Sequence, residues 1–333
     1  MDSVRVGVSY YVSDQVRELI EAVSDRVEVI DITQMLREEE EGSPGARERV
    51  DEALGSLEVL FMARVPEDLV RRAPKLRWVQ YFATGIEAFV GAEMLNAHFK
   101  FSNVTGTTAL AIAEHCFMFM LMFTKRAPLW MEHQNAHDYE RRSVLPDFFE
   151  GKTVGILGMG TIGLEVARLS KAFRMRVLAT RRTAQSGMAG EGDVDQIYPA
   201  SETTGLLAES DFVVLAVPMT PQTRHVINEA ALRAMKSTAY LINVGRGGLI
   251  DETALVSALE SGEIAGAGLD VFGEEPLPSD SSLWDAPNLL MTPHVSGDLV
   301  DHRVRTARFF CEQLGRYLAG EPVRNVIDPD RGY

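Results

Sequence analysis

The feature that most restricts the fold of this chain is a strand, a glycine-rich turn and a helix that follow one another over residues 151–173. Residues 153–157 form a short apolar run, as expected of a buried parallel strand. The segment GMGTIG follows at 158–163, and apolar residues then recur at helical spacing up to Phe173. In this order the three parts form the fingerprint of a dinucleotide-binding unit.

Each glycine of the fingerprint has its own role. Gly158 permits the tight turn, Gly160 lets the backbone approach a pyrophosphate, and Gly163 lets the helix pack closely on the strand. The helix N-terminus offers N–H groups and the positive end of a dipole to the phosphates. Glycines also mark ordinary turns between a strand and a helix, but the correct flanks favour dinucleotide binding.

Strand candidates alternate with helical stretches through the rest of the chain, which predicts doubly wound parallel sheets. Helices are expected at 13–24, 107–124, 130–142 and 297–318, and an exposed charged loop at 38–49. The strand candidates are residues 4–9, 27–32, 57–62, 76–82 and 101–104 before the fingerprint and 176–180, 211–217, 239–244, 264–269 and 289–292 after it.

The fingerprint lies in the middle of the chain, so the nucleotide domain is expected to be inserted into another domain. We predict a substrate domain from residues 1–100 plus 298–333 and a dinucleotide-binding domain from residues 101–297. The helices near 107–124 and 298–319 would make the two crossings.

Composition excludes several classes of function. The 333 residues are 46% hydrophobic and 24% charged, as in a soluble globular protein. The net charge of −15 argues against nucleic acid or an anionic membrane as a partner. The two cysteines form no metal or redox motif, and the first residues do not form a signal peptide, so a reducing, cytoplasmic location is expected.

Three polar residues that could carry chemistry follow late strand candidates. Arg246, Glu275 and His294 each stand next to glycine or proline, where a strand gives way to a loop. Carboxyl ends of parallel strands share one edge of the sheet, which is also the edge that binds the dinucleotide. Each residue alone is more often an ordinary surface group, but the three together predict an active-site cluster.

Several motifs occur in order along the chain. They are AIAEH at 111–115, VPMTPQTRHVIN at 217–228, MKSTAYLINVGRGGLIDETAL at 235–255, GAGLDVFGEEPLP at 266–278 and TPHVSG at 292–297. With the fingerprint they resemble the D-isomer-specific 2-hydroxyacid dehydrogenase family, in particular its glyoxylate and hydroxypyruvate reductases. The resemblance covers residues 103–325. It implies an α/β fold of two doubly wound domains, with a Rossmann dinucleotide-binding domain inserted into a flavodoxin-like substrate domain.

The family's catalytic residues fall on the same three positions. The resemblance implies that Arg246 holds the carboxylate of a 2-oxo acid with a fork of donors that lysine lacks. It implies that His294 is the general acid that protonates the carbonyl oxygen as a hydride arrives. Glu275 would stabilise the imidazolium form of His294. In reverse, His294 would be the base that oxidises a D-2-hydroxy acid.

The resemblance also implies positions that bind the substrate and line the cofactor. The turn Thr84-Gly85-Ile86 matches the family's carboxylate-binding loop, although Glu87 stands where many members have aspartate. Asp270 would lie near the nicotinamide amide. The cofactor-lining positions are Gly158, Gly160, Thr161, Ile162, Gly163, Pro218, Thr223, Val244, Asp270 and Gly297.

The strand at 176–180 decides between the two nicotinamide cofactors. An NAD-binding fold has an acidic residue at the end of this strand, which accepts hydrogen bonds from the ribose hydroxyls. Here the strand ends in Thr180-Arg181-Arg182-Thr183, without Asp or Glu. Two guanidinium groups and the hydroxyls of Thr180 and Thr183 would bind a 2′-phosphate, so NADP(H) is the preferred cofactor. The alternative is that both arginines are solvated and NAD(H) is also used.

Two other functions remain open at this point. A formate or phosphite dehydrogenase belongs to the same superfamily, but the formate enzymes pair their histidine with glutamine, where this chain has Glu275. A dinucleotide-sensing co-repressor would keep the fold and the site for regulation without catalysis.

The remaining expectations concern assembly and the other histidines. The helix at 109–123 is apolar on every side, and the family pairs through this region, so a homodimer is predicted. His133 and His137 are expected to be surface histidines, with no metal site. Glu114 and His115 are expected to orient a helix at the domain junction.

Overall fold

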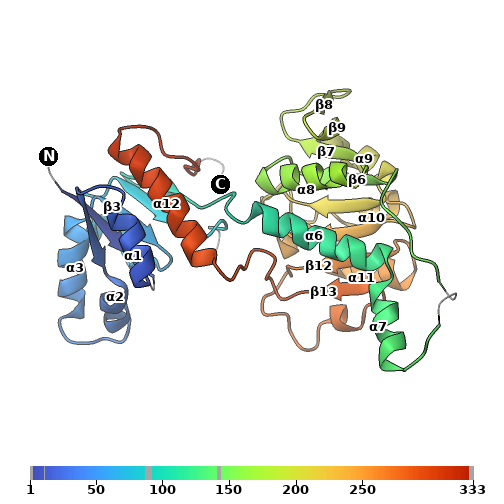
Figure 1. Cartoon of the computed structure of the whole chain (residues 1–333), viewed down its shortest axis with the longest axis horizontal. Helices are drawn as coiled ribbons and strands as arrows, with labels where there is room; N and C mark the ends of the chain where they lie inside the picture. The colour runs from blue at the N-terminus through green and yellow to red at the C-terminus, as the bar shows by residue number, and fades with distance from the viewer. Residues whose placement is uncertain (1–2, 11, 87–91, 141–143, 330–333) are drawn as a thin grey trace. The chain divides into compact units, whose positions relative to one another are not determined.

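The computed structural model describes residues 3–10, 12–86, 92–140 and 144–329 (Figure 1). The chain divides into two compact units. Unit 1 comprises Met1–Thr107 together with Leu299–Tyr333, and unit 2 comprises Thr108–Asp298. The sequence placed the corresponding boundaries between residues 100 and 101 and between residues 297 and 298.

Unit 1 is built on a five-stranded parallel sheet in the order β2-β1-β3-β4-β5. This is the 2-1-3-4-5 order of flavodoxin-like folds. Its central strands are buried on both faces, as a parallel sheet covered by helices requires. The strands are β1 (Val4–Val8), β2 (Val27–Asp31), β3 (Val59–Met62), β4 (Trp78–Tyr81) and β5 (Lys100–Ser102).

Helices cover both faces of this sheet. On one face, α1 (Asp14–Glu21) and α12 (His302–Leu318) pack against β1, β3 and β4. There Phe310 of α12 stacks on Phe61, with ring centroids 4.4 Å apart. The C-terminal segment therefore returns to unit 1 because it supplies part of that core. The other face carries α2 (Thr33–Glu40), α3 (Ala46–Ser56), α4 (Leu69–Arg72) and α5 (Ala92–Leu95).

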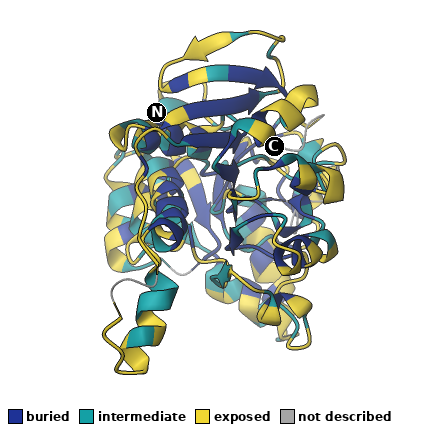
Figure 2. Ribbon diagram, turned by 90° about the vertical axis from the view of Figure 1, so that its right-hand side faces the viewer, coloured by how far each residue is buried: buried dark blue, intermediate teal, exposed yellow. Residues whose placement is uncertain are grey.

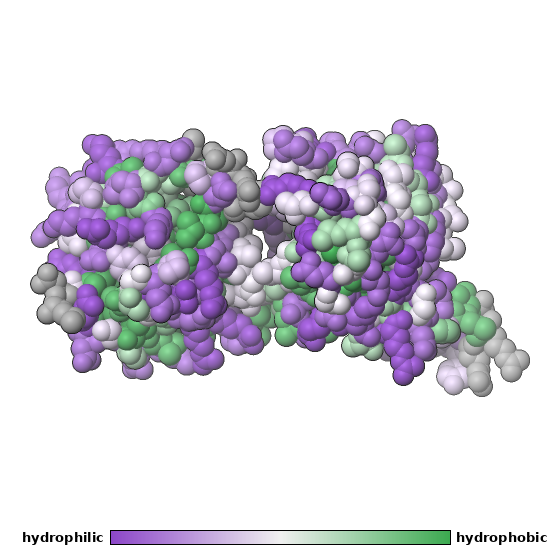
Figure 3. All heavy atoms as spheres, turned by 90° about the horizontal axis from the view of Figure 1, so that it is seen from above, coloured by the Kyte–Doolittle hydropathy of each residue, from purple (hydrophilic) through white to green (hydrophobic). Residues whose placement is uncertain are grey.

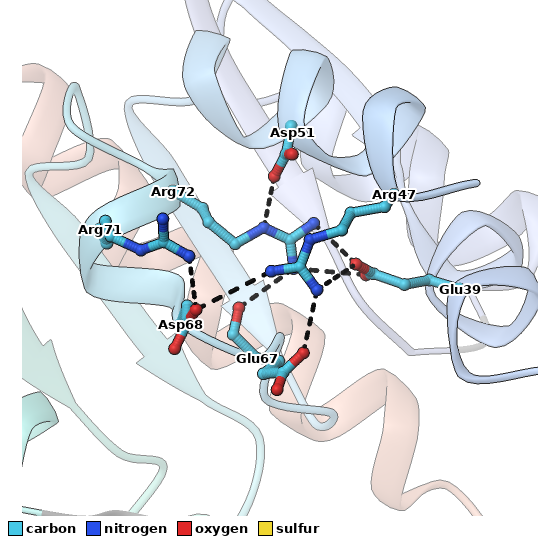
Figure 4. A network of polar contacts seen from close by, with 7 residues as sticks. All are labelled: Glu39, Arg47, Asp51, Glu67, Asp68, Arg71 and Arg72. Carbon is cyan, nitrogen blue, oxygen red and sulfur yellow. Dashed lines mark hydrogen bonds and ion pairs between the residues drawn. The ribbon is translucent and has the colours of Figure 1, made fainter. Parts of the chain in front are cut away.

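The expectation of an exposed loop at residues 38–49 is wrong, because α2 and α3 leave only residues 41–45 between them. Glu38, Glu39 and Glu40 of this stretch form ion pairs with arginines outside α2. Arg72, whose side chain is only 4% exposed, binds Glu39 at 2.9 Å and also binds Asp51 (Figure 4). The charges therefore join three helices instead of marking a solvated loop. Further ion pairs of the network join Arg47 to Glu39, Glu67 and Asp68, and Arg71 to Asp68.

Unit 2 is built on an eight-stranded sheet in the order β13-β12-β11-β10-β6-β7-β9-β8. Neighbouring strands are parallel except at the edge, where β8 pairs antiparallel with β9. The direction of winding reverses between β6 and β10, which is the switch point where such sheets bind nucleotides. The strands are β6 (Thr153–Leu157), β7 (Arg176–Arg181), β8 (Ala189–Glu191), β9 (Val194–Pro199), β10 (Phe212–Leu215), β11 (Tyr240–Asn243), β12 (Gly266–Leu269) and β13 (Leu289–Met291).

Helices again cover both faces, and Figure 2 shows the buried central strands and the exposed edge strand β8. One face packs against α6 (Ala109–Thr124) and α8 (Thr161–Ala172). The other packs against α9 (Thr203–Glu209), α10 (Glu229–Ala234) and α11 (Glu252–Glu260). The helix α7 (Ala127–Asn135) follows α6 and has no buried residue. Short 3-10 helices lie at η1 (Ala200–Glu202), η2 (Gly247–Leu249) and η3 (Ser282–Asp285).

Several element boundaries differ from the sequence predictions. The helix expected at 130–142 is α7, which ends at Asn135, and residues 141 and 142 lie outside the described part. The last helix begins at His302 and not at 297, and α6 lies wholly within unit 2. The β8–β9 hairpin was not predicted. Within the described ranges, no helix is both long enough and apolar enough to span a bilayer.

Candidate functional site

The candidate residues of unit 2 follow the carboxyl ends of parallel strands. Such ends share one edge of a sheet, so the fold gathers these residues along the edge that contains the switch point. They are Gly158, Gly160, Thr161, Ile162 and Gly163 after β6, Thr180, Arg181 and Arg182 at β7, Pro218 and Thr223 after β10, Val244 and Arg246 after β11, Asp270 and Glu275 after β12, and His294 and Gly297 after β13.

The turn between β6 and α8 has the geometry of a phosphate cradle. Gly158 has a φ of +104°, and a Cβ there would lie 2.7 Å from the Ala216 carbonyl oxygen. A Cβ on Gly163 would lie 2.0 Å from the carbonyl oxygen of Gly158. In contrast, a Cβ on Gly160 would meet no atom within 4 Å. Gly160 also gives α8 no side-chain cap, so the turn leaves open space and N–H donors for a pyrophosphate.

The end of β7 is more complex than its sequence indicates. Thr180 is buried, and its hydroxyl accepts a hydrogen bond from the N–H of Gly158 at 3.1 Å. Arg181 extends toward β8, where its Nη1 lies 2.7 Å from the Glu191 carboxylate and its Nη2 lies 3.2 Å from Sδ of Met188. The strand itself ends without an acid, but the fold brings one from the neighbouring hairpin.

The other cofactor-lining positions are a mixture of exposed and buried groups. Arg182 and Pro218 are exposed, whereas Val244 is buried. The hydroxyl of Thr223 donates to the Pro218 carbonyl at 2.7 Å and so closes the turn after β10. A Cβ on Gly297 would lie 3.7 Å or more from the nearest atoms, so this position has ordinary packing space.

Arg246 stands on a loop that the buried side chain of Asn243 holds in place. The Asn243 amide donates to the Arg246 carbonyl at 2.9 Å and accepts a backbone N–H of the same loop at 3.1 Å. A Cβ on Gly247 would lie 1.8 Å from the carbonyl carbon of Phe272. The loop of Arg246 therefore lies directly against the chain that leads to Glu275.

Glu275 and His294 form a hydrogen-bonded pair. One oxygen of Glu275 accepts the N–H of Phe272 at 2.9 Å, and the other lies 2.6 Å from Nδ1 of His294. Because a carboxylate only accepts, Nδ1 must carry a proton. Nε2 is then the nitrogen that gains or loses a proton, on a side chain that is 48% exposed. The arrangement suits a general acid or base.

The loop that carries His294 is held by the buried carboxylate of Asp270. One oxygen of Asp270 accepts the Thr292 hydroxyl at 2.5 Å and the Val295 N–H at 2.9 Å. The other oxygen accepts the Ser296 N–H at 2.9 Å. Burial raises the pKa of Asp270, but the hydrogen bonds from Ser296, Thr292 and Val295 outweigh burial and hold the pKa below its usual value. Asp270 thus anchors the loop on both sides of His294.

His115 of α6 extends this network, since its Nε2 lies 2.9 Å from Oγ1 of Thr292. The Thr292 hydroxyl gives its only hydrogen to Asp270, so Nε2 of His115 must be the donor to Thr292. Burial lowers the pKa of His115, with Asp270 opposing, in agreement with a neutral ring. Sequence reasoning missed Thr292, although its place directly after β13 and two residues before His294 was a usable signal.

The remaining candidates belong to unit 1. The turn Thr84-Gly85-Ile86 follows β4, and the side chain of Ile86 is buried in the core of the unit. The Thr84 carbonyl accepts a hydrogen bond from the Asn103 amide at 2.8 Å. Glu87 lies outside the described residues. The Asn103 amide and the buried Ile86 side chain therefore hold this turn in place at the carboxyl end of β4.

The sequence is similar to a known family over both units. A family model for the D-isomer specific 2-hydroxyacid dehydrogenase, NAD binding domain, matches residues 117–296. Glyoxylate reductase from Pyrococcus furiosus is 34% identical over 282 residues, which are 83% of this chain and 82% of that protein. Glyoxylate/hydroxypyruvate reductase B from Pectobacterium carotovorum subsp. carotovorum is 36% identical over 274 residues, 80% of this chain and 83% of that protein.

Two solved structures match the fold over the whole chain. A D-isomer specific 2-hydroxyacid dehydrogenase from Xanthobacter autotrophicus Py2, in complex with NADPH and MES, has a TM-score of 0.81 at 27% identity and full coverage of both chains. An NADPH-dependent glyoxylate/hydroxypyruvate reductase from Sinorhizobium meliloti, in complex with NADP and sulfate, has a TM-score of 0.76 at 26% identity, again with full coverage of both chains.

The network around Asp270 generates a prediction for Thr292→Val, which removes the hydroxyl at nearly constant volume. The buried carboxylate loses one hydrogen bond and His115 loses its acceptor, which costs about 1–3 kcal/mol. We expect the thermal unfolding midpoint at pH 7 to fall by about 2–4 °C per kcal/mol. Because hydrogen bonds lower the pKa of Asp270, their contribution is present above about pH 4 and fades as the pH falls through the lower folded-state pKa. The difference in unfolding midpoint between Thr292→Val and the wild type should therefore become smaller at acidic pH.

Thr203→Val is the matched control. The hydroxyl of Thr203 lies at an exposed site and donates to the nearby Ala200 carbonyl, so its loss should change stability by less than about 0.5 kcal/mol. If Thr292→Val unfolds at the wild-type temperature, the hydroxyl contributes nothing to the loop.

Proposed function

The chain belongs to the D-isomer specific 2-hydroxyacid dehydrogenase family, and on this premise we propose that it reduces a small 2-oxo acid to a D-2-hydroxy acid with NADP(H). The observation that carries the proposal is the His294–Glu275 pair, at the same sheet edge as the glycine turn. Glyoxylate and hydroxypyruvate are the proposed substrate class, because the similar proteins carry these names.

Three side chains divide the chemical work in this proposal. Arg246 binds the substrate carboxylate with its planar fork and polarises the adjacent carbonyl. His294 gives the Nε2 proton to the carbonyl oxygen, and in the reverse direction it takes the hydroxyl proton. Glu275 accepts from Nδ1, which orients the ring and stabilises its imidazolium form. The nicotinamide, when bound, supplies or accepts the hydride.

In unit 1 the proposed substrate-binding element is the turn Thr84-Gly85-Ile86, whose backbone N–H groups would bind a substrate carboxylate. We propose accordingly that unit 1 is the substrate domain and unit 2 the dinucleotide-binding domain. The support is the position of this turn at the carboxyl end of β4, where open α/β sheets bind ligands.

The proposed cofactor is NADP(H) in preference to NAD(H). The open space at Gly160 and the uncapped N-terminus of α8 suit the pyrophosphate that both cofactors share. Arg181 and Arg182 at the end of β7 would bind the 2′-phosphate. Thr180 serves the glycine turn instead, so recognition of this phosphate falls to the two arginines. Two of the similar structures were solved with NADPH or NADP.

The catalytic proposal predicts a large loss of reductive turnover in His294→Ala. Removing a general acid should lower kcat with glyoxylate by roughly 10²–10⁴ while cofactor binding stays near normal. Glu275→Gln should lower the pH at which reduction fails, because the imidazolium loses its negatively charged partner. The measurement is the rate at which NADPH absorbance falls, recorded as a function of pH for the wild type and both variants.

His133→Ala is the matched control for this experiment, because His133 lies on α7 and its ring nitrogen pairs with Asp138 just beyond that helix. Near-normal turnover of His294→Ala would contradict the assignment. A wild type inert toward every 2-oxo acid would favour the co-repressor, and turnover of formate or phosphite would favour that branch of the superfamily.

The cofactor proposal predicts a preference that depends on two arginines. With one oxo acid, kcat/KM should favour NADPH over NADH by at least about tenfold, roughly the worth of one charge-assisted hydrogen bond. Arg181→Ala or Arg182→Ala should reduce this ratio. Arg176→Ala, at the other end of β7, is the control. Equal or better use of NADH by the wild type would reject the proposal.

We also propose that two copies pair through unit 2. Leu110 and Met118 of α6 are 46% and 36% exposed, although the opposite side of α6 is buried in the core. Leu164 of α8 is 48% exposed and Phe173 just beyond α8 is 41% exposed. Figure 3 shows apolar side chains exposed among polar ones on this unit. Neighbouring helices with large exposed apolar side chains are typical of a subunit interface.

Light scattering at micromolar concentration should therefore give about twice the chain mass of 36.8 kDa. Leu110→Asp combined with Leu164→Asp should give the monomer mass, because a charge cannot be buried unpaired at an interface. Trp284→Asp, at an exposed apolar position on η3, should leave the mass unchanged. A monomer mass for the wild type would refute the pairing.

A further inference from the structure

The β8–β9 hairpin is a fixed element at the edge of the sheet in unit 2, beside β7 (Figure 1). A Cβ on Gly190 would lie 2.0 Å from a carbonyl oxygen of β9, and Gly192 at the tip has a φ of +59°. Asp195 of β9 accepts the N–H of Val177 at 2.7 Å and pairs with Lys171 of α8 at 2.5 Å. The hairpin is therefore fastened to both β7 and α8.

The hairpin brings a carboxylate to the proposed phosphate-binding arginine. Glu191 lies 2.7 Å from Nη1 of Arg181, and Met188 lies 3.2 Å from its Nη2. The Nε of Arg181 is buried and makes no hydrogen bond within the described residues. The side chain of Arg181 is 29% exposed and that of Glu191 is 65% exposed. One terminal nitrogen of the Arg181 guanidinium group is thus already paired with a carboxylate of the same chain.

We propose that Glu191 competes with the 2′-phosphate for Arg181, so that its charge limits the preference for NADP(H) over NAD(H). The inference rests on the proposed function, because it takes Arg181 as a phosphate-binding residue. Carboxylate and phosphate oxygens use the same guanidinium donors in the same planar geometry. An incoming 2′-phosphate must displace Glu191 or bind beside its negative charge. A ribose 2′-hydroxyl is uncharged and meets neither penalty.

The geometry favours competition over a positioning role. A carboxylate that orients an arginine typically binds it through two parallel hydrogen bonds. Glu191 makes a single contact with Nη1, through an exposed side chain that loses rotamer freedom to hold it. Such a contact restrains the guanidinium weakly, but its charge still lies where a phosphate oxygen would bind.

The test uses the full chain and measures the binding of NADPH and NADH by nicotinamide fluorescence. The quantity compared is the ratio of the Kd for NADH to the Kd for NADPH. Glu191→Gln should raise this ratio about two- to fivefold, the worth of an exposed ion pair. The rise should shrink as the ionic strength increases, because salt screens exposed charges. The rise in the ratio should disappear in the Arg181→Ala background, because the guanidinium group for which Glu191 and the phosphate compete is then absent.

Glu209→Gln is the matched control, since Glu209 pairs with Arg176 at the opposite end of the same strand. It should leave the ratio unchanged. An unchanged or lower ratio in Glu191→Gln would overturn the competition, as would a rise that persists in Arg181→Ala. If the wild type binds NADH more tightly than NADPH, only the proposed cofactor preference is rejected. A higher ratio in Glu191→Gln than in the wild type would still support the role of Glu191.

Discussion

The acid–base geometry of unit 2 depends on one buried carboxylate. Asp270 has no exposed surface, and a charge in that position is stable only when donors surround it. The donors come from the loop after β13, the strand next to β12. To supply them the loop turns the N–H groups of Val295 and Ser296 inward, and His294, directly before these two residues, takes a φ of +54°. The ring of His294 then lies against Glu275, so the orientation of this pair follows from satisfying a buried charge.

The proposed phosphate-binding part of the site must attract an anion to a chain that is itself acidic. The chain carries a net charge of −15, so an anionic cofactor must be attracted by local features against the overall charge. The uncapped N-terminus of α8 and the arginines at the end of β7 are such features. Thr180, buried behind them, hydrogen-bonds the glycine turn and thereby couples β7 to the cradle. In the proposed competition, Glu191 of the exposed edge strand β8 adjusts this attraction through Arg181 without touching the turn.

The sequence predicted which elements the chain forms better than it predicted their boundaries. The glycine turn and the strands around it could be predicted because residue spacing and backbone freedom are local properties. The charged stretch at 38–49 was misread because its partners Glu67, Asp68 and Arg72 stand elsewhere in the sequence. The β8–β9 hairpin was missed for a related reason. Its short, exposed strand has no apolar alternation, and its position comes from contacts with β7 and α8.

By itself the sequence determined the two doubly wound folds, the family, the glycine cradle and the identity of the three polar residues at strand ends. Each of these depends on residue type and spacing within motifs and on the order of those motifs along the chain. Only the tertiary structure decided which groups meet across long separations, as with His115 and Thr292 or Arg181 and Glu191. Whether a carboxylate anchors a loop or contests an arginine depends on its burial and on its neighbours in space. The packing of the folded chain determines the burial and the neighbours of each carboxylate, and no local sequence pattern encodes them.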